Sequence, residues 1–338
     1  MSHSVTDRHR MRRICAIVVM TLLGVSLFPC AARAFGPPAA IRSLRSGLHD
    51  LVERFPATSA VEVLDLSSGY RVGYNAAASM PAASTIKVPV MVEVFRQLEA
   101  GRFDLTHRMT LLASDKDYGS GDLCDQSPGN TYSVNELLEK MIDISDNTAT
   151  NMLIRLIGRA NINATMRRLG LEHTRLTGDV RTDSYAVRQT LRTSPADMVR
   201  LLSLMAKREL VDNWSSNEMI SILEEDQINT LLPEPLPDDV PIAHKTGSFS
   251  DTLNDVGIVY ADDAPYVIAV MTTHLPSLSM GRSFIRSLSS MAFHQEARLA
   301  MWRSAVGIAT FANGAPGSNS PDIRYWQNPN ATESGIGG

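Results

Sequence analysis

The order of helical and strand periodicities along the chain is the strongest constraint on its fold. Apolar residues at helical spacing fill residues 39–54, and residues 59–76 read as two short strands around a turn. Strands return only at 242–261 and 265–274, where the apolar run suits a sheet covered on one or both faces, before a last helix at 283–311. The end of the chain must therefore rejoin its beginning. This predicts an α+β fold with an antiparallel sheet flanked by N- and C-terminal helices.

The stretch between the two groups of strands, about residues 80–238, is predicted to be an inserted helical lobe. Helical spacing begins near Ser84 and again near Ser194, each just before apolar positions three and four residues apart. Ser133 lies three residues before Glu136, which is the pattern of a capping box at a helix start. The lobe would therefore contain several short helices that separate the two halves of the sheet.

The first 34 residues have the layout of a secretory signal peptide. Four arginines precede the apolar run 14–28, and the small residues Ala32 and Ala34 follow it. About 15 apolar residues are too few to span a bilayer, which takes about 20. We therefore expect cleavage after Ala34, a periplasmic or secreted protein without stable membrane association, a folded domain at 35–312 and a disordered tail at 313–338, which is rich in Gly, Ser, Asn and Pro.

Composition excludes several classes of partner and cofactor. Loss of the leader would leave 27 basic and 35 acidic residues, a net charge of −8, which does not suit nucleic acid. Only Cys124 of the three cysteines would remain, so no intramolecular disulfide and no cysteine-based metal site is expected. Neither a cluster of metal ligands nor a phosphate-binding loop is present in the sequence, so we expect no cofactor, and a monomer that binds a small-molecule substrate.

Three short motifs follow one another in a specific order. "STIK" at 84–87 is joined by "SDN" at 145–147, about 60 residues later, and by "KTG" at 245–247, about 100 residues further on. Each motif is weak by itself, since Ser-x-x-Lys pairs are common on exposed helices and "SDN" makes an ordinary helix cap. Together they form the signature of class A β-lactamases and penicillin-binding proteins.

From about residue 39 to 308 the chain therefore resembles the class A β-lactamases, within the penicillin-recognising serine hydrolases that carry a Ser-x-x-Lys motif. The resemblance implies the β-lactamase/DD-peptidase-like fold. It also implies that the chain opens the β-lactam ring through an acyl-enzyme on a serine.

The first two motifs supply the groups for acyl transfer. Ser84, at a helix start whose N–H groups and dipole favour an anion, is the candidate nucleophile. Lys87 lies one turn later within reach of its hydroxyl, and burial beside a second cation would lower the pKa of Lys87 so that it accepts a proton. Ser145 can pass a proton to the leaving nitrogen, and Asn147 can bind a substrate amide.

The third motif supplies groups that bind substrate. Lys245 and Thr246 offer a cation and a hydroxyl to a substrate carboxylate, and Gly247 leaves room for substrate beside the backbone. The backbone N–H of Ser248 would complete the oxyanion hole with that of Ser84. His244, just before this motif, is expected to be a structural histidine.

The sequence departs from the class A pattern where the acyl group should be released. Class A enzymes carry a Glu-x-x-Leu-Asn element whose Glu activates water, and this chain has no such element. The Glu would fall near Gly178, so Asp179 is the nearest candidate base and Asp183 the next. The strand after "KTGS" also lacks the Arg that many class A members have there, and has Asn254, Asp255 and Val256 instead, which is a milder departure.

Three functions remain open at this stage. The chain could be a β-lactamase with an unusual water-activating group, or a D-alanyl-D-alanine peptidase or esterase-like relative. It could also be a penicillin-binding protein that traps one acyl group and turns over little.

Overall fold

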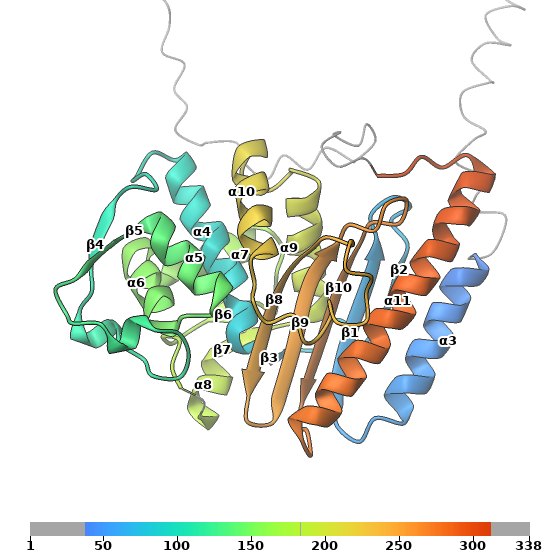
Figure 1. The fold of residues 1–338 in the computed structure, drawn as a ribbon, viewed down its shortest axis with the longest axis horizontal. Helices are drawn as coiled ribbons and strands as arrows, with labels where there is room; N and C mark the ends of the chain where they lie inside the picture. Colours follow the sequence, from blue (N-terminus) through green and yellow to red (C-terminus); the bar gives the residue numbers. More distant parts are fainter. Residues whose placement is uncertain (1–37, 183, 312–338) are drawn as a thin grey trace, which may run out of the picture.

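The computed structural model describes residues 38–182 and 184–311 (Figure 1). The predicted signal peptide at 1–34, the predicted tail at 313–338 and Asp183 lie outside the described residues.

The centre of the described chain is an antiparallel sheet in which the first and last strands are neighbours. Its five strands are arranged in the order β2-β1-β10-β9-β8. In the register of the central pair, Thr58 of β1 lies opposite Thr273 of β10, and Asp65 opposite Tyr266. The closure of the chain that the sequence predicts is therefore confirmed. The strands span β1 Thr58–Asp65, β2 Arg71–Tyr74, β8 Ile242–Phe249, β9 Thr252–Val259 and β10 Tyr266–Thr273.

Helices cover both faces of this sheet. The N- and C-terminal helices pack side by side on one face, as Figure 1 shows at the right: α3 (Ala39–Glu53) and α11 (Leu278–Val306). On the opposite face, α9 (Pro195–Ala206) packs against β1, β9 and β10. The sheet is therefore the middle layer of three.

The central strand β10 is buried on both sides, which explains its nearly unbroken apolar sequence. Tyr266, Ile268 and Val270 belong to the core under α3 and α11. Val267 and Ala269, which alternate with them, belong to the core that the sheet shares with the helical lobe. Two cores thus meet at one sheet.

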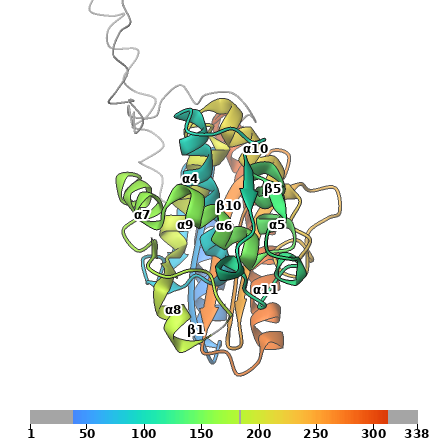
Figure 2. The same ribbon diagram turned by 90° about the vertical axis from the view of Figure 1, so that its left-hand side faces the viewer.

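The helices of the lobe lie toward the viewer in Figure 2. They pack around α4, which is buried on nearly every side, so Lys87 at its first position is buried as well. The lobe helices are α4 Lys87–Glu99, α5 Val134–Asp143, α6 Asn147–Ile157, α7 Arg159–Arg168, α8 Tyr185–Thr190 and α10 Asn213–Glu224.

Short elements complete the lobe and its junction with the sheet. Two small ladders form, β4 with β5 and, at the junction, β7 between β3 and β6. The strands are β3 Met80–Pro81, β4 Arg108–Thr110, β5 Thr131–Ser133, β6 Arg175–Leu176 and β7 Leu191–Thr193, and the 3₁₀ turns are η1 Ala83–Ile86, η2 Ala113–Asp115 and η3 Leu123–Asp125.

Helix starts follow the predicted caps. Ser133 Oγ accepts from the N–H of Glu136 at 3.2 Å, and the Glu136 carboxylate accepts from the N–H of Ser133 at 2.6 Å, so the capping box is confirmed. The last helix begins five residues earlier than predicted because Ser277 Oγ caps it by accepting from the N–H of Met280. No helix within the described ranges is long and apolar enough to cross a membrane.

Candidate active site

The three motifs meet at one cavity of about 380 Å³ between the lobe and the exposed edge of β8. Lys87 and Lys245 lie behind this cavity, and neither is exposed. All the other predicted acylation and substrate-binding residues line it: Ser84, Ser145, Asn147, Thr246, Gly247 and Ser248.

Ser84 lies in the 3₁₀ turn η1 rather than in the α-helix itself, which begins at Lys87. The residue before it, Ala83, has a φ of 47°, a left-handed conformation that is strained for a residue with a Cβ. Asn254 holds the chain in front of this turn, because its side-chain amide donates to the carbonyls of Pro81 at 2.8 Å and Ala82 at 3.1 Å. One residue of the segment that lacks the class A Arg thus anchors the nucleophile turn.

Gly247 allows β8 to lie directly against this turn. A Cβ at Gly247 would come within 2.9 Å of the Ala82 carbonyl oxygen and 3.0 Å of the Ser84 backbone nitrogen. Both neighbours are backbone atoms, which cannot rotate away. The glycine therefore brings the strand into contact with the backbone beside the Ser84 N–H.

Lys87 is fully buried and makes three hydrogen bonds. Its Nζ donates to the Ser145 carbonyl at 2.5 Å, to Ser145 Oγ at 3.0 Å and to Asn147 Oδ1 at 2.9 Å. Burial and the nearby Lys245 lower the pKa of Lys87 well below its usual value, although surrounding carboxylates oppose the shift. A neutral amine has two N–H bonds and one lone pair, so in that form Lys87 would donate to the two carbonyl oxygens and accept from the Ser145 hydroxyl.

The "SDN" segment serves as both a helix cap and a wall of the site. Asp146 Oδ1 accepts from the N–H of Ala149 at 2.7 Å and so caps α6. Ser145 adopts a left-handed φ of 57°, and its carbonyl and hydroxyl both contact Lys87 Nζ. The middle residue therefore caps the helix while its two neighbours contact Lys87.

Lys245 is paired with a carboxylate that sequence reasoning missed. Asp226, in the loop after α10, accepts from Lys245 Nζ at 2.9 Å and from the N–H of Thr246 at 3.2 Å, and both charged side chains are fully buried. A buried lysine requires a counterion, but nothing in the local sequence indicates which of the surrounding acids supplies it.

His244 faces away from the cavity and into a polar network. Its Nδ1 lies 3.0 Å from Asp255 Oδ1, and its Nε2 lies 3.1 Å from Asn229 Oδ1. Burial favours the neutral ring, but the adjacent Asp255 outweighs it and raises the pKa of His244. These contacts fit the structural role that we expect from the sequence.

The structure does not support Asp179 as the base that activates water. One of its carboxylate oxygens pairs with Arg159 and the other accepts from Arg181 at 3.0 Å, so both are occupied by guanidinium groups. The following residues, Val180, Arg181 and Thr182, line the cavity, whereas Asp179 does not. Among the described residues that line the cavity, none is Asp or Glu.

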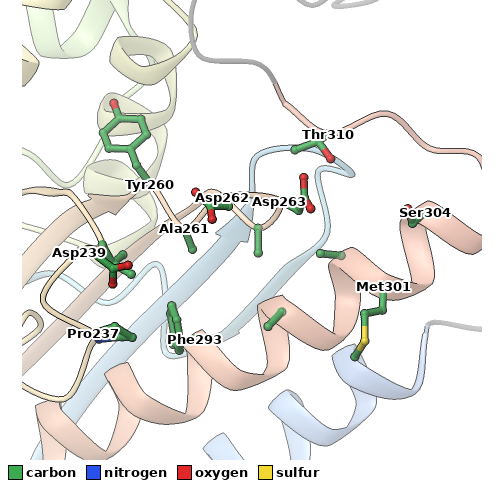
Figure 3. A pocket seen from close by; sticks show the side chains of 14 residues that line it. Pro237, Asp239, Tyr260, Ala261, Asp262, Asp263, Phe293, Met301, Ser304 and Thr310 are labelled. Carbon is green, nitrogen blue, oxygen red and sulfur yellow. The ribbon is translucent and has the colours of Figure 1, made fainter.

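A second, larger cavity of about 600 Å³ lies between α11 and the β9–β10 turn (Figure 3). Its labelled lining includes Asp239, Asp262 and Asp263 together with Phe293 of α11, and it contains none of the three motifs. Within residues 38–182 and 184–311, no group of three His, Cys, Asp or Glu side chains is placed to hold a metal.

Solved structures share this fold. PBP-A is 32% identical with a TM-score of 0.71, and the match covers 75% of this chain and 96% of PBP-A. A variant of PBP-A in an acyl-enzyme complex with penicillin G gives a TM-score of 0.72 at 32% identity, with 76% and 97% covered. A β-lactamase from Sphaerobacter thermophilus is 27% identical with a TM-score of 0.70, with 77% and 97% covered.

Sequence comparison agrees. The β-lactamase BRO-1 of Moraxella catarrhalis is 24% identical over 205 residues, which are 57% of this chain and 63% of BRO-1, so the match spans less than two thirds of that relative. The profile of the β-lactamase enzyme family matches residues 43–295, which is most of the chain. With the fold and the relatives in agreement, the chain belongs to the β-lactamase enzyme family.

Proposed function

We propose that the protein opens the β-lactam ring through an acyl-enzyme on Ser84. The observation that carries this proposal is the buried Lys87, which directly follows the nucleophile turn and whose Nζ, with its lowered pKa, lies 3.0 Å from the Ser145 hydroxyl. A lowered pKa increases the fraction of neutral amine, the form that can accept the proton of a serine. Membership of the β-lactamase family supports the same reaction class.

In the proposed acylation, Ser84 Oγ bonds to the lactam carbonyl carbon while Lys87 takes its proton. The ring C–N bond then breaks, and the lactam nitrogen receives a proton from Ser145 Oγ. Lys87 Nζ, 3.0 Å from that hydroxyl, returns the proton to Ser145. The N–H groups of Ser84 and Ser248 would stabilise the oxyanion.

The substrate carboxylate would be bound at the β8 edge. The hydroxyls of Thr246 and Ser248 belong to residues that line the cavity, whereas Lys245 is buried behind them and paired with Asp226. We therefore assign direct contact to the two hydroxyls. Lys245 would act at longer range and lower the pKa of Lys87.

Release of the acyl group is proposed to be slow. The family's water-activating Glu is missing from the sequence, and the described lining of the cavity contains no carboxylate. General-base assistance contributes about 10² to 10⁴ in rate, so its loss should leave the acyl-enzyme as the species that accumulates. The protein would then behave more like a penicillin-trapping protein than a fast β-lactamase.

The test is rapid mixing of the protein with a chromogenic cephalosporin, with the intact mass recorded during the reaction. We expect a burst of one equivalent, a mass adduct on the protein and slow turnover afterwards. Fast steady turnover with no adduct would contradict slow release. If the protein shows no burst and no turnover, the β-lactam assignment is rejected altogether.

A D-alanyl peptide is the second candidate substrate. It offers an amide next to a terminal carboxylate, which the same serine and the same hydroxyls could bind. The higher identity to PBP-A, 32% against 27% for the Sphaerobacter β-lactamase, favours keeping this alternative. Release of D-alanine from a D-alanyl-D-alanine peptide, absent in a Ser84→Ala variant, would establish it.

We also propose that the protein is exported as a monomer with a mature domain at 35–312. The arginine-rich start, the apolar run and the small residues before Phe35 support the export and the cleavage site. Expression of the full chain in a Gram-negative host should give periplasmic protein whose mass begins at Phe35. Protein that keeps its first 34 residues would contradict it.

A further inference from the structure

We propose that Asp117 is a positioning residue of the Ser84 site. It fixes the orientation of the Asn147 amide, and it holds the wall segment, residues 180–182 of the cavity lining, next to that amide. Asp117 lies in the loop between η2 and η3, outside all three motifs, and is 6% exposed. Its kinetic test rests on the proposed acylation of Ser84, whereas its structural test does not.

The Asp117 carboxylate accepts four hydrogen bonds from the site. Its Oδ1 accepts from Asn147 Nδ2 at 2.8 Å and from the N–H of Gly119 at 3.0 Å. Its Oδ2 accepts from the N–H of Thr182 at 2.7 Å and from Thr182 Oγ1 at 3.2 Å. A carboxylate has about four acceptor positions, so all of them are used. Asp117 is therefore occupied as an anchor and has no position left to activate water.

These bonds determine which way the Asn147 amide points. An ionised carboxylate only accepts hydrogen bonds, so the Asn147 NH₂ group must face Asp117. The amide oxygen then faces Lys87, where it accepts from Nζ at 2.9 Å. With Asn in place of Asp117, the neighbouring amide could rotate and present its NH₂ group to the lysine instead. Asp117 thus keeps an acceptor on the candidate base.

The same carboxylate holds the opposite wall of the cavity. Thr182 lines the cavity, comes from a segment far from Asp117 in sequence, and is bound through both its N–H and its hydroxyl. The segment holds a second link to the lobe, since Asn151 Nδ2 donates to the carbonyl of Val180 at 2.9 Å. Loss of the Asp117 bonds should therefore loosen the wall near Thr182 without releasing the whole loop.

The surroundings of Asp117 are shaped for close approach. A Cβ at Gly119 would come within 2.9 Å of Asp117 Oδ1, 3.1 Å of Thr182 Oγ1 and 3.2 Å of Asn147 Nδ2, so a side chain there would displace the groups that meet at Asp117. The backbone N–H of Asp117 donates to Thr148 Oγ1 at 3.1 Å, which holds the residue in place. The Asp117 backbone N–H, the close approach at Gly119 and the four hydrogen bonds of the carboxylate together fix the position of Asp117.

Asp117 also contributes to the charge balance at Lys87. Lys245 on β8 lowers the pKa of Lys87, whereas Asp146 before α6, Asp226 after α10 and Asp117 raise it. Removal of one of these negative charges should lower the pKa of Lys87 further. Because acylation needs the neutral amine, the fall in rate at acid pH should then begin at a lower pH.

The experiment compares Asp117→Asn with Asp115→Asn. Asp115 is a matched control, since it lies two residues earlier, at the end of η2, is 4% exposed and pairs with Arg155 at 3.0 Å, while no hydrogen bond of its side chain reaches Ser84, Lys87, Ser145 or Asn147. The first measurement is hydrogen exchange of the peptides that cover residues 178–190, without any substrate. We expect faster exchange around Thr182 in Asp117→Asn and little change there in Asp115→Asn.

The second measurement is the rate of penicillin acylation by intact mass, as a function of pH. Displaced catalytic groups can cost on the order of 10²-fold, so Asp117→Asn should lower the rate about tenfold to a hundredfold and move its acid limb to lower pH. Thr182→Val removes only one of the four hydrogen bonds of Asp117, so it should lower the acylation rate less and leave the pH at which the rate falls unchanged.

Three outcomes would overturn the proposal: unchanged exchange near Thr182, an acid limb that does not move, or equal effects in the Asp115→Asn control. A parent protein that penicillin does not acylate would reject the proposed function. In that case the exchange measurement alone would still decide whether Asp117 holds the wall.

Discussion

At the scale of single residues, the site depends on contacts between segments that are far apart in sequence. Ser84, Lys87, Ser145 and Lys245 could be named as candidate site residues from the sequence because each belongs to a short motif with a known chemistry. Asp226 could not, because it lies 19 residues from Lys245 in sequence and belongs to no motif. Asp179 was the nearest carboxylate in sequence, but its arginine partners turn it into a structural anchor.

Ser84→Ala tests the nucleophile directly. The variant should lose all covalent labelling by penicillin-type reagents, and its melting temperature should stay close to that of the parent because a partly exposed serine at an open cavity contributes little packing. Intact mass and thermal unfolding measure the two effects. A penicilloyl adduct on the variant would show that another residue is the nucleophile.

The buried pair of Lys245 and Asp226 predicts that loss of the lysine lowers the stability of the fold. Lys245→Met leaves Asp226 buried without its cation, which should lower the free energy of unfolding by about 3 to 5 kcal/mol. The double variant with Asp226→Asn should lose less, because the uncompensated charge is gone. Urea unfolding of both variants makes the comparison. Equal losses would indicate that packing, rather than charge, determines the cost.

At the scale of elements, sequence periodicity located most helices and strands but not their contacts. The two halves of the sheet and the flanking helices were predictable because β10 and α3 carry clear apolar patterns. The 3₁₀ turn at Ala83–Ile86 was not, because its geometry depends on β8 and on Asn254 from β9. Local sequence gives no indication of a contact made some 170 residues away.

The C-terminal helix α11 carries a buried acid that should make stability depend on pH. Burial, and then the charge of Asp65, raise the pKa of Glu296 to about 8, while Arg303 opposes the shift. In the unfolded chain the same group titrates near 4.5. Between these values the folded state holds a proton that the unfolded state has lost. This group's contribution to stability is therefore complete below about pH 4.5 and is lost as the pH rises through about 8.

Glu296→Gln should remove this dependence. Between pH 5 and 8, this group should lower the free energy of unfolding of the parent by up to about 1.4 kcal/mol per pH unit. The variant lacks this loss, so its free energy of unfolding should rise relative to that of the parent over the same range. Chemical unfolding at several pH values measures the difference. Glu99→Gln, at an exposed position just inside the end of α4, is the control. A constant difference between parent and Glu296→Gln would refute the raised pKa.

At the scale of the whole molecule, the two cores share one sheet. Val256, Ile258 and Val267 pack with the helical lobe, while their neighbours on the same strands, such as Val259 and Ile268, pack under α3 and α11. The Ser84 cavity lies where lobe and sheet meet, since Ser145 comes from the lobe and Thr246 from β8. Neither part can keep the site if the other unfolds, because the strands that complete one core also complete the other.

The shared sheet predicts that the lobe and the flanking helices unfold in one cooperative step. Two tryptophans report on the two parts separately: Trp214 on α10 lies beside Phe95 in the lobe, with ring centroids 6.0 Å apart, and Trp302 on α11 lies beside Tyr70, at 6.1 Å. We consider two variants, each of which keeps either Trp214 or Trp302 and has the other two tryptophans changed to Phe. In each variant, the urea midpoint measured by tryptophan fluorescence should equal the midpoint measured by circular dichroism. If the Trp214 signal changes at a lower urea concentration than the Trp302 signal, the lobe unfolds first and the sheet does not couple the two cores.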